Sequence, residues 1–381
     1  MPADHPHVTP TERAATLASR RRAYDRRTNP AGLELGRSNN NLDVVRHDGR
    51  TWLALRTAPS HFASADARIE VLASADEGAT WALDRTIAVG RDVREPRFVS
   101  WHGRLLLSWF TAGTRATRFE PDVIWVSERD GAGWDEPEAI SPPDCVVWRV
   151  RPIDDRLCMT VYRGAGSLFT ASPVPLTVEL WISDDGRRWA PADPLHPAVH
   201  VGGAEAEFIQ LPDGRVTAVV RKEGPEGGWG SDIALAPHFD PTTWITRHDP
   251  RKFDSPYLFL DKGRPHLVAR RQVAFGGRYD LGLRFLPDGL RTKVDQLAYW
   301  LTPKRTALYR IDPDALTATW LADLPSAGDT AFAGSIPTAD GRGHLVFNYS
   351  SPPHHRWWPW VLGQLRPTHI SVVEVHLPDA T

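Results

Sequence analysis

Arginine recurs at one position after a turn that this chain repeats six times. The seventh residue after each turn is Arg56, Phe110, Tyr162, Arg221, Arg270 or Asn348, and Arg163, Arg271 and Tyr349 directly follow three of these. A guanidinium group binds a carboxylate or a phosphate through two parallel hydrogen bonds. If Arg56, Arg221 and Arg270 converge, we therefore expect them to bind a small anion such as sulfate, citrate or an acidic sugar.

A second set of polar residues stands where the first strand of each hairpin begins. It comprises Asn39–Asn41, Glu95, Arg149, Glu205, Glu207, Asp254 and Asp329. The start of one strand and the end of its antiparallel neighbour lie at the same end of a hairpin. The two sets together predict a polar funnel suited to an anionic or heavily hydroxylated ligand. The alternative is that acids and arginines of neighbouring hairpins form purely structural ion pairs, although burying so many charges is costly.

A repeat of short β-hairpins must position these side chains. Its turns, each between two apolar runs, are Asp48-Gly49, His102-Gly103, Asp154-Asp155, Asp213-Gly214, Lys262-Gly263 and Asp340-Gly341. A tryptophan closes the later part of five units: Trp81, Trp134, Trp189, Trp244 and Trp320. Asp-Gly between β-rich runs favours a hairpin, and units of about 50 residues built from short strands are typical of propellers. We predict an all-β, six-bladed β-propeller over residues 36–381.

Two segments stand outside the regular repeat. Residues 1–35 form an N-terminal extension, for which we predict a short amphipathic helix over Thr11–Tyr24. Either this extension, near Leu33–Leu35, or the C-terminal end closes the ring. The fifth unit is longer than the others and predicts an excursion between Phe275 and Arg305.

Composition narrows the classes of function. The 381 residues are 41% hydrophobic and carry a formal net charge of −2, so nothing indicates binding to nucleic acid or to a membrane. Cys145 and Cys158 do not stand opposite each other in their hairpin, and we expect two free buried thiols, no metal site and no cofactor. Residues 1–29 lack the apolar segment of a secretory signal, which predicts a cytoplasmic protein. The oligomeric state is not indicated.

One turn carries a recognisable motif. Ser74-Ala75-Asp76-Glu77-Gly78-Ala79-Thr80-Trp81 fits the Asp-box pattern S-x-D-x-G-x-T-W, and degraded copies run from Ser127 to Trp134 and from Ser183 to Trp189. The Asp and Ser side chains are expected to bond the backbone of the turn, Gly to adopt a positive φ, and Trp to pack between blades. With these boxes, residues 36–381 resemble the sialidase (neuraminidase) superfamily.

The resemblance implies roles for particular residues. Sialidases bind the sugar carboxylate with three arginines, use an Asp as acid/base, and attack with a Tyr that a Glu activates. Glu205 to Arg215 resembles the family motif E-x-x-x-x-x-L-P-D-G-R, which places Glu205 on the activating Glu and Arg221 on a clamp arginine. By the same resemblance Glu95 falls in the N-acyl pocket, Asp66 is the acid/base candidate with His61 nearby, and Arg270 or Arg271 supplies a further clamp.

The sequence departs from the family where the nucleophile is expected. The start of the sixth inner strand reads Asp329-Thr330-Ala331-Phe332, and phenylalanine cannot attack, whereas Tyr349 ends the adjacent strand. The first inner strand begins with Asn39–Asn41 where the family has Arg-Ile-Pro. Trp357, Trp358 and Trp360 either stack on sugar rings near the funnel or cap the last blade.

Three hypotheses follow. The first is a glycoside hydrolase acting on an anionic or N-acylated sugar; it includes an inverting enzyme whose acid and base are among Asp66, Glu205, Asp254 and Asp329. The second is a non-catalytic carbohydrate-binding propeller. The third is a polysaccharide or uronate lyase that uses Tyr349 and His61. In each case the expected partner is a small molecule or oligosaccharide.

Overall fold

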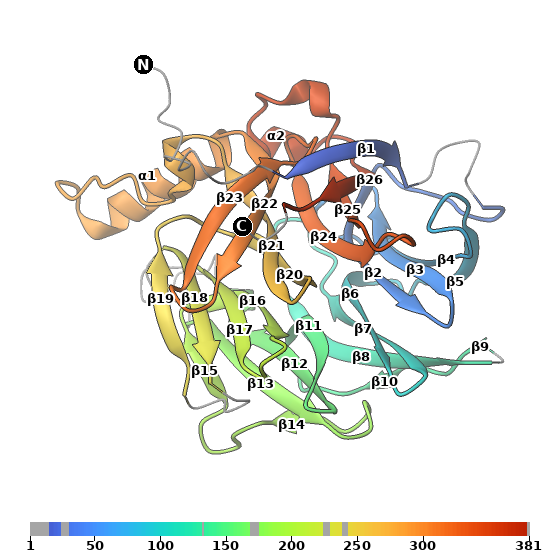
Figure 1. Ribbon diagram of the computed structural model, residues 1–381. Coiled ribbons are helices and arrows are strands. Elements are labelled where there is room, and N and C mark those ends of the chain that lie inside the picture. The colour runs from blue at the N-terminus through green and yellow to red at the C-terminus, as the bar shows by residue number, and fades with distance from the viewer. Residues whose placement is uncertain are drawn as a thin grey trace.

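Antiparallel sheets surround a central axis in the computed structural model (Figure 1). The structure describes residues 15–23, 30–131, 133–167, 175–223, 229–237 and 243–378. Within them, six sheets of four or five strands are formed, and the chain is a six-bladed β-propeller as predicted.

The first three blades follow the chain in order, each listed here from its innermost strand outward. Blade one contains β2 (Ser38–His47), β3 (Arg50–Ala58), β4 (Arg68–Ser74) and β5 (Ala82–Ile87). Blade two contains β6 (Asp92–Trp101), β7 (Arg104–Ala112), β8 (Pro121–Asp130) and β10 (Glu138–Ala139), with β9 (Gly133–Trp134) also pairing with β8. Blade three contains β11 (Val146–Ile153), β12 (Arg156–Arg163), β13 (Thr177–Ser183) and β14 (Ala190–Pro191), with β15 (Ala198–Val201) also pairing with β13.

The last three blades complete the ring. Blade four contains β16 (Gly203–Gln210), β17 (Val216–Lys222), β18 (Gly230–Ala236) and β19 (Ile245–Asp249). Blade five contains β20 (Asp254–Asp261), β21 (Arg264–Gln272), β22 (Lys304–Asp312) and β23 (Thr317–Asp323). Blade six contains β24 (Thr330–Pro337), β25 (His344–Ser350), β26 (His369–His376) and β1 (Thr16–Arg22). The innermost strands contact one another in chain order, and β24 also contacts β2, which closes the circle.

The helices lie in two long connections. The excursion of blade five, between β21 and β22, contains a 3-10 turn at Phe275–Gly277 and helix α1 (Asp288–Leu301). The connection between β25 and β26 contains a 3-10 turn at Pro353–His355 and helix α2 (Trp360–Gln364). A separate 3-10 turn spans Ala165–Ser167, between β12 and β13. Helices α1 and α2 contact each other at the same end of the propeller (Figure 1). Among the described residues, no helix has both the length and the apolar character needed to cross a membrane.

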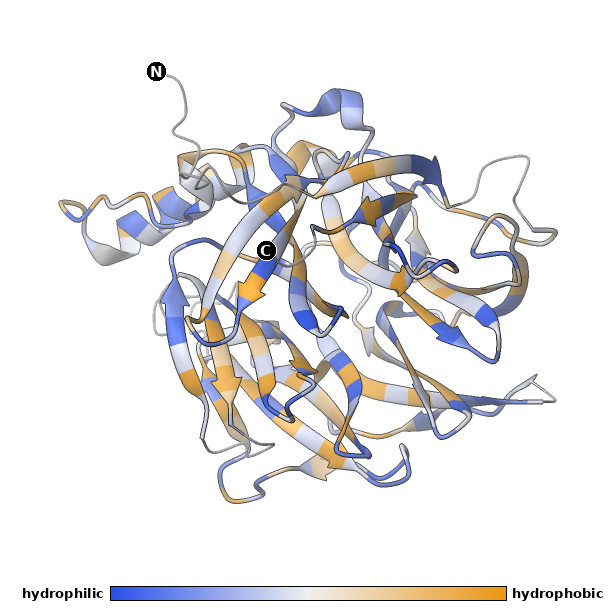
Figure 2. Cartoon of the chain, viewed as in Figure 1, coloured by the Kyte–Doolittle hydropathy of each residue, from blue (hydrophilic) through white to orange (hydrophobic). Residues whose placement is uncertain are grey.

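The predicted hairpin turns explain why consecutive strands pair. Asp48 and Gly49 have φ of 48° and 69°, and Lys262 and Gly263 have φ of 48° and 78°. Positive φ at both central residues is the geometry whose twist matches that of the flanking strands. Hydrophobic residues concentrate on the strands and hydrophilic residues on many of the turns (Figure 2).

The turn between β4 and β5 has the bonds that its sequence predicts. The Ser74 hydroxyl accepts the Gly78 amide at 2.7 Å, and Asp76 accepts the amide and hydroxyl of Thr80, each at 2.7 Å. These bonds from Thr80 lower the pKa of Asp76 to about 2. Gly78 has φ of +77°, and a Cβ there would lie 2.6 Å from the Trp81 ring. Trp81 is buried, so this turn anchors the core.

The N-terminal segment corrects one prediction. Residues 16–22 are not helical but form β1, which pairs antiparallel with β26 as the outer strand of blade six. Residues 11–14 and Tyr24 of the predicted helix lie outside the described residues. The free edge of β26 offers a row of backbone partners, whereas a short isolated helix is marginal in water. Trp81 of blade one donates to the Ala23 carbonyl at 2.7 Å, which ties this strand to the neighbouring blade.

Candidate functional site

Every innermost strand carries a β-bulge near its start. The register shifts after Asn40, Arg94, Val147, Ala204, Asp254 and Ala331. At five of the bulges a non-glycine residue adopts a positive φ: Asn41 (43°), Glu95 (51°), Glu205 (46°), Ser255 (50°) and Phe332 (49°). Such conformations are uncommon, and a bulge redirects a side chain. Together with Trp148, the bulge residue of blade three, we call these residues the axial ring.

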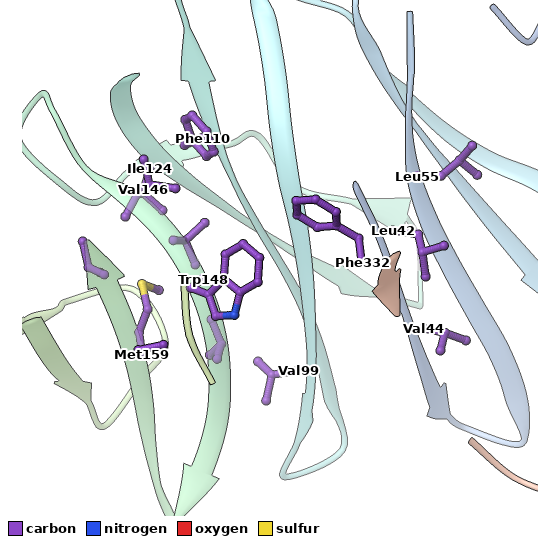
Figure 3. Packing of buried hydrophobic residues seen from close by; sticks show 14 of the residues in the cluster. Leu42, Val44, Leu55, Val99, Phe110, Ile124, Val146, Trp148, Met159 and Phe332 are labelled. Carbon is purple, nitrogen blue, oxygen red and sulfur yellow. The ribbon is translucent and has the colours of Figure 1, made fainter. Parts of the chain in front are cut away.

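Contacts between blades place this ring at the axis. Trp148 and Phe332 belong to opposite blades, yet their ring centroids lie 5.4 Å apart (Figure 3). Asn41 donates to Glu95 at 2.5 Å, and Glu205 accepts the Ser255 amide at 2.7 Å. The six bulges therefore bring one residue from each blade to a common centre.

The second strands add a set of residues beside the ring. In the strand register Arg56 faces Asn40, Arg221 faces Ala204, Arg270 faces Asp254, and Tyr349 faces Ala331. Each of these partners directly precedes an axial-ring residue. Tyr349, and not Asn348, takes the position of the arginines, because the turn of blade six is longer and closes from Thr338 to Gly343.

Arg221 lies at the centre of an acid-rich cluster. Its guanidinium is 2.7 Å from Glu205, 3.4 Å from Glu223 and 3.6 Å from Asp254. Lys252 is 2.7 Å from Glu223 and 3.5 Å from Asp254. The charges therefore compensate one another within the cluster.

Asp254 differs from the other acids in this cluster. Its side chain is buried, and Arg221, Lys252 and Arg270 lie 3.5 to 3.9 Å from its oxygens. Within the described residues, neither carboxylate oxygen accepts a hydrogen bond, and the Ser255 hydroxyl also lacks a partner. Buried polar atoms without partners are rare, and such a group is suited to bind a hydroxyl of a ligand.

Asp329, Tyr349 and His61 form a second group of contacts. The Tyr349 hydroxyl donates to Asp329 at 2.9 Å and accepts from Arg270 at 3.3 Å, while His61 Nδ1 lies 2.7 Å from Asp329. Burial alone would raise the pKa of Asp329, but His61, Arg270 and Tyr349 hold it below its ordinary value. Burial raises the pKa of Tyr349 well above its ordinary value, and Asp329 adds to this effect.

Glu95 has the opposite shift. Its carboxylate lies 2.8 Å from Arg97, but burial raises its pKa to about 7, and Glu205 adds to the effect. Burial, together with Asp254, also raises the pKa of Glu205, although Arg221 opposes this. The pKa of Glu95 therefore lies close to neutral pH, whereas that of Asp329 is held below its ordinary value. Tyr162 is buried close to Glu205 and Arg221, and burial followed by Glu205 raises its pKa well above its ordinary value.

Several predicted residues lie near the ring but already form ion pairs with other residues of the protein. Arg56 is buried and donates to Asp92 from Nε and Nη2, at 2.9 and 2.8 Å. Arg149 and Glu207 form a buried pair at 2.6 Å, and Arg149 also contacts Asp43 at 3.0 Å. The expected convergence of three uncompensated arginines is therefore wrong: Arg56 and Arg221 already pair with carboxylates, and only Arg221 and Arg270 face the same acid.

Other predicted residues lie away from the ring. Arg271 pairs with Asp323 through two contacts of 2.6 Å on the outer part of blade five. Arg163 is 3.7 Å from Glu179 and is 39% exposed. Asp66 is exposed on the loop between β3 and β4, where its amide contacts Ser64. No contact to the axial ring is found for Asp66 among the described residues.

The structure adds Lys252, Tyr279 and Tyr299, which the sequence did not single out, and it places Trp360 of the predicted tryptophan cluster beside the site. Lys252 lies 4.7 and 4.6 Å from the ring centroids of Tyr279 and Tyr299, which the excursion of blade five contributes. Trp360, at the start of α2, donates to Asp329 at 3.2 Å and lies 5.0 Å from the Arg270 guanidinium. For Tyr279 and Tyr299 the signal in the sequence was the length of the excursion.

The fold and the site define a six-bladed β-propeller with a buried charged centre. Similar solved structures include a Dyadobacter fermentans protein of unknown function, with TM-score 0.66 and 14% identity over 96% of this chain and 100% of that one. Trypanosoma rangeli sialidase in complex with the inhibitor DANA matches with TM-score 0.63 and 13% identity over 93% of this chain. An α-L-arabinofuranosidase mutant from Fusarium graminearum in complex with an iminosugar inhibitor matches with TM-score 0.57 and 12% identity over 88% and 93% of the two chains.

These comparisons show the fold. The match spans 59% of the sialidase chain. No protein-family model and no curated protein sequence matches the chain. The two neighbours of stated activity are both glycoside hydrolases.

Proposed function

We propose that the chain is a glycoside hydrolase whose substrate binds over the axial ring. The observation that carries this proposal is Asp254, a buried carboxylate among three cations with no hydrogen-bond donor on either oxygen within the described residues. Such a group has free lone pairs for a water molecule or a sugar hydroxyl. The likeness to glycoside hydrolases supports the proposal at the level of the fold.

Glycoside hydrolysis requires one carboxyl that donates a proton and one carboxylate that remains ionised. Glu95, with its pKa raised to about 7, is suited to protonate the leaving-group oxygen. Asp254 is suited to activate a water molecule as the general base. Glu205 bonds both Arg221 and the Ser255 amide and thereby positions them. This arrangement needs no attack by tyrosine, which agrees with Phe332 at the sixth bulge.

The balance of positive and negative side chains in the acid-rich cluster indicates the charge of the substrate. Arg221 and Lys252 face Glu205, Glu223 and Asp254 at 3.6 Å or less, so the site presents no large excess of positive charge. An anionic sugar would have to displace these pairs. A neutral or N-acylated sugar needs only hydrogen bonds, and we therefore place the substrate in that class.

The test is a screen of aryl and natural glycosides for released sugar. We expect turnover of at least one neutral or N-acylated glycoside by the wild type, and a strong loss in the Asp254→Asn and Glu95→Gln variants. Glu70→Gln is the matched control, because Glu70 is buried and paired with Arg68 on an outer strand of blade one. Unchanged turnover in both site variants would contradict the assignment.

A second candidate is a non-catalytic carbohydrate-binding propeller. It is favoured by Phe332 at the position where the sialidase resemblance places the nucleophile, and by the complete burial of Tyr349. Saturable binding of a glycan by the wild type, without release of sugar across the screen, would decide for this function.

A further inference from the structure

A cavity lies on blade six, away from the axial ring. It is bordered by β1, by β26 and by the segment after β25, and its volume is about 410 Å³. This is within the range of small-molecule sites, about 300–1,000 Å³. Arg20, Arg22, His354, His369 and Ser371 contribute to its lining, which contains no acidic side chain among the described residues.

The strand register explains why these residues gather. Arg22 faces Ser371 directly across the β1–β26 pair. Side chains two residues apart on a strand share a face, so Arg20 joins Arg22, and His369 joins Ser371. Arg20 Nη2 also donates to the Ser371 hydroxyl at 3.4 Å. The intervening Arg21 is used differently, since it donates to the backbone carbonyls of Glu77 and Gly78.

Among the described residues, no counter-charge accompanies the positive charge in this cavity. Neither Arg20 nor Arg22 forms an ion pair within the described residues, and Arg20 has only the neutral Ser371 as a side-chain partner. Partial burial lowers the pKa of both Arg20 and His369, and the nearby positive charge of Arg22 adds a smaller effect in the same direction. Two guanidinium groups and two imidazoles thus surround a space that no carboxylate of the described residues enters.

We propose that this cavity binds the oxyanion group of a phosphorylated or sulfated small molecule. Guanidinium groups bind tetrahedral oxyanions through paired, charge-assisted hydrogen bonds. The volume leaves room for the organic part of the ligand beside the oxyanion. The site is separate from the axial ring, so this inference holds whether or not the proposed glycosidase activity does.

Isothermal titration calorimetry at low ionic strength tests the proposal. The probes are glucose 6-phosphate and glucose 6-sulfate, with glucose as the uncharged control and inorganic phosphate and sulfate as the bare oxyanions. We expect saturable binding of at least one sugar ester and none of glucose. The Arg20→Ala/Arg22→Ala variant should bind at least tenfold more weakly. Circular dichroism and Tm establish that this variant is folded, as expected for exposed side chains on an outer strand.

Arg342→Ala is the matched control, because Arg342 is an 81% exposed arginine in the turn of the same blade and does not line the cavity. Its affinity should equal that of the wild type. No binding of either ester by the wild type would overturn the proposal, as would equal affinity in the double variant. Binding of inorganic phosphate or sulfate alone would show an ion site only and overturn the assignment to a small molecule.

Discussion

Replacing Glu95 with glutamine should change the free energy of unfolding more favourably at pH 8 than at pH 4, compared with the wild type at the same pH. In the folded state burial raises the pKa of Glu95 from 4.5 to about 7. A raised pKa means that the folded protein keeps a proton that the unfolded chain releases, so the free energy of unfolding falls as pH rises from about 4.5 to 7. The gap between these pKa values corresponds to at most roughly 3 kcal/mol. Glutamine cannot ionise, so the variant escapes this loss.

The assay is urea denaturation followed by tryptophan fluorescence, on wild type and Glu95→Gln, at several values between pH 4 and pH 8. The difference in unfolding free energy should move in favour of the variant as pH rises. Asp329→Asn is the comparison variant, because the pKa of Asp329 is lowered from 3.8 and its stabilising effect is lost only below that pH, so its difference from the wild type should stay nearly constant over this range. A Glu95→Gln difference that stays constant with pH would refute the argument for a buried proton.

Three further outcomes are expected. Arg271→Ala should remove the partly exposed ion pair with Asp323 and lower the free energy of unfolding by roughly 1 kcal/mol. Glycan binding and any turnover should be unchanged, and loss of either would show that Arg271 belongs to the site. Trp81→Ala should lower the free energy of unfolding in urea by about 3–5 kcal/mol, because the buried ring and its bond to Ala23 are lost, and a change under 1 kcal/mol would exclude an anchoring role. Burial raises the pKa of Cys145 to about 11 and of Cys158 to about 12. Iodoacetamide at pH 8 should therefore label neither thiol until urea unfolds the protein. Labelling of the native protein would contradict their burial.

The fold could be predicted because its information is local. Each hairpin depends on a two-residue turn, and residues such as Asp48 and Gly49 specify that turn by themselves. The N-terminal strand β1 could not be predicted in this way. Its partner β26 lies more than 340 residues further along the chain, and nothing in residues 16–22 distinguishes an edge strand from a short helix.

The site could be predicted only in part. Counting from the turn located Arg221 and Arg270 correctly beside the axis, because the strand register is regular there. In blade six it placed Asn348 at the equivalent position and Tyr349 directly after it, whereas Tyr349 takes that position because the turn there is longer. Counting also could not show that Arg56 is already bound by Asp92, since that pair joins blades one and two.

The most direct test of the central claim compares leaving groups in the Glu95→Gln variant, using the sugar that the glycoside screen identifies. If Glu95 donates the proton, kcat/KM for an alkyl glycoside should fall by about 10²–10⁴. A dinitrophenyl glycoside has a leaving group that departs without protonation, so its cleavage should fall far less. Equal losses for both substrates, or no loss for either, would contradict a proton-donating Glu95 at the axis of this propeller.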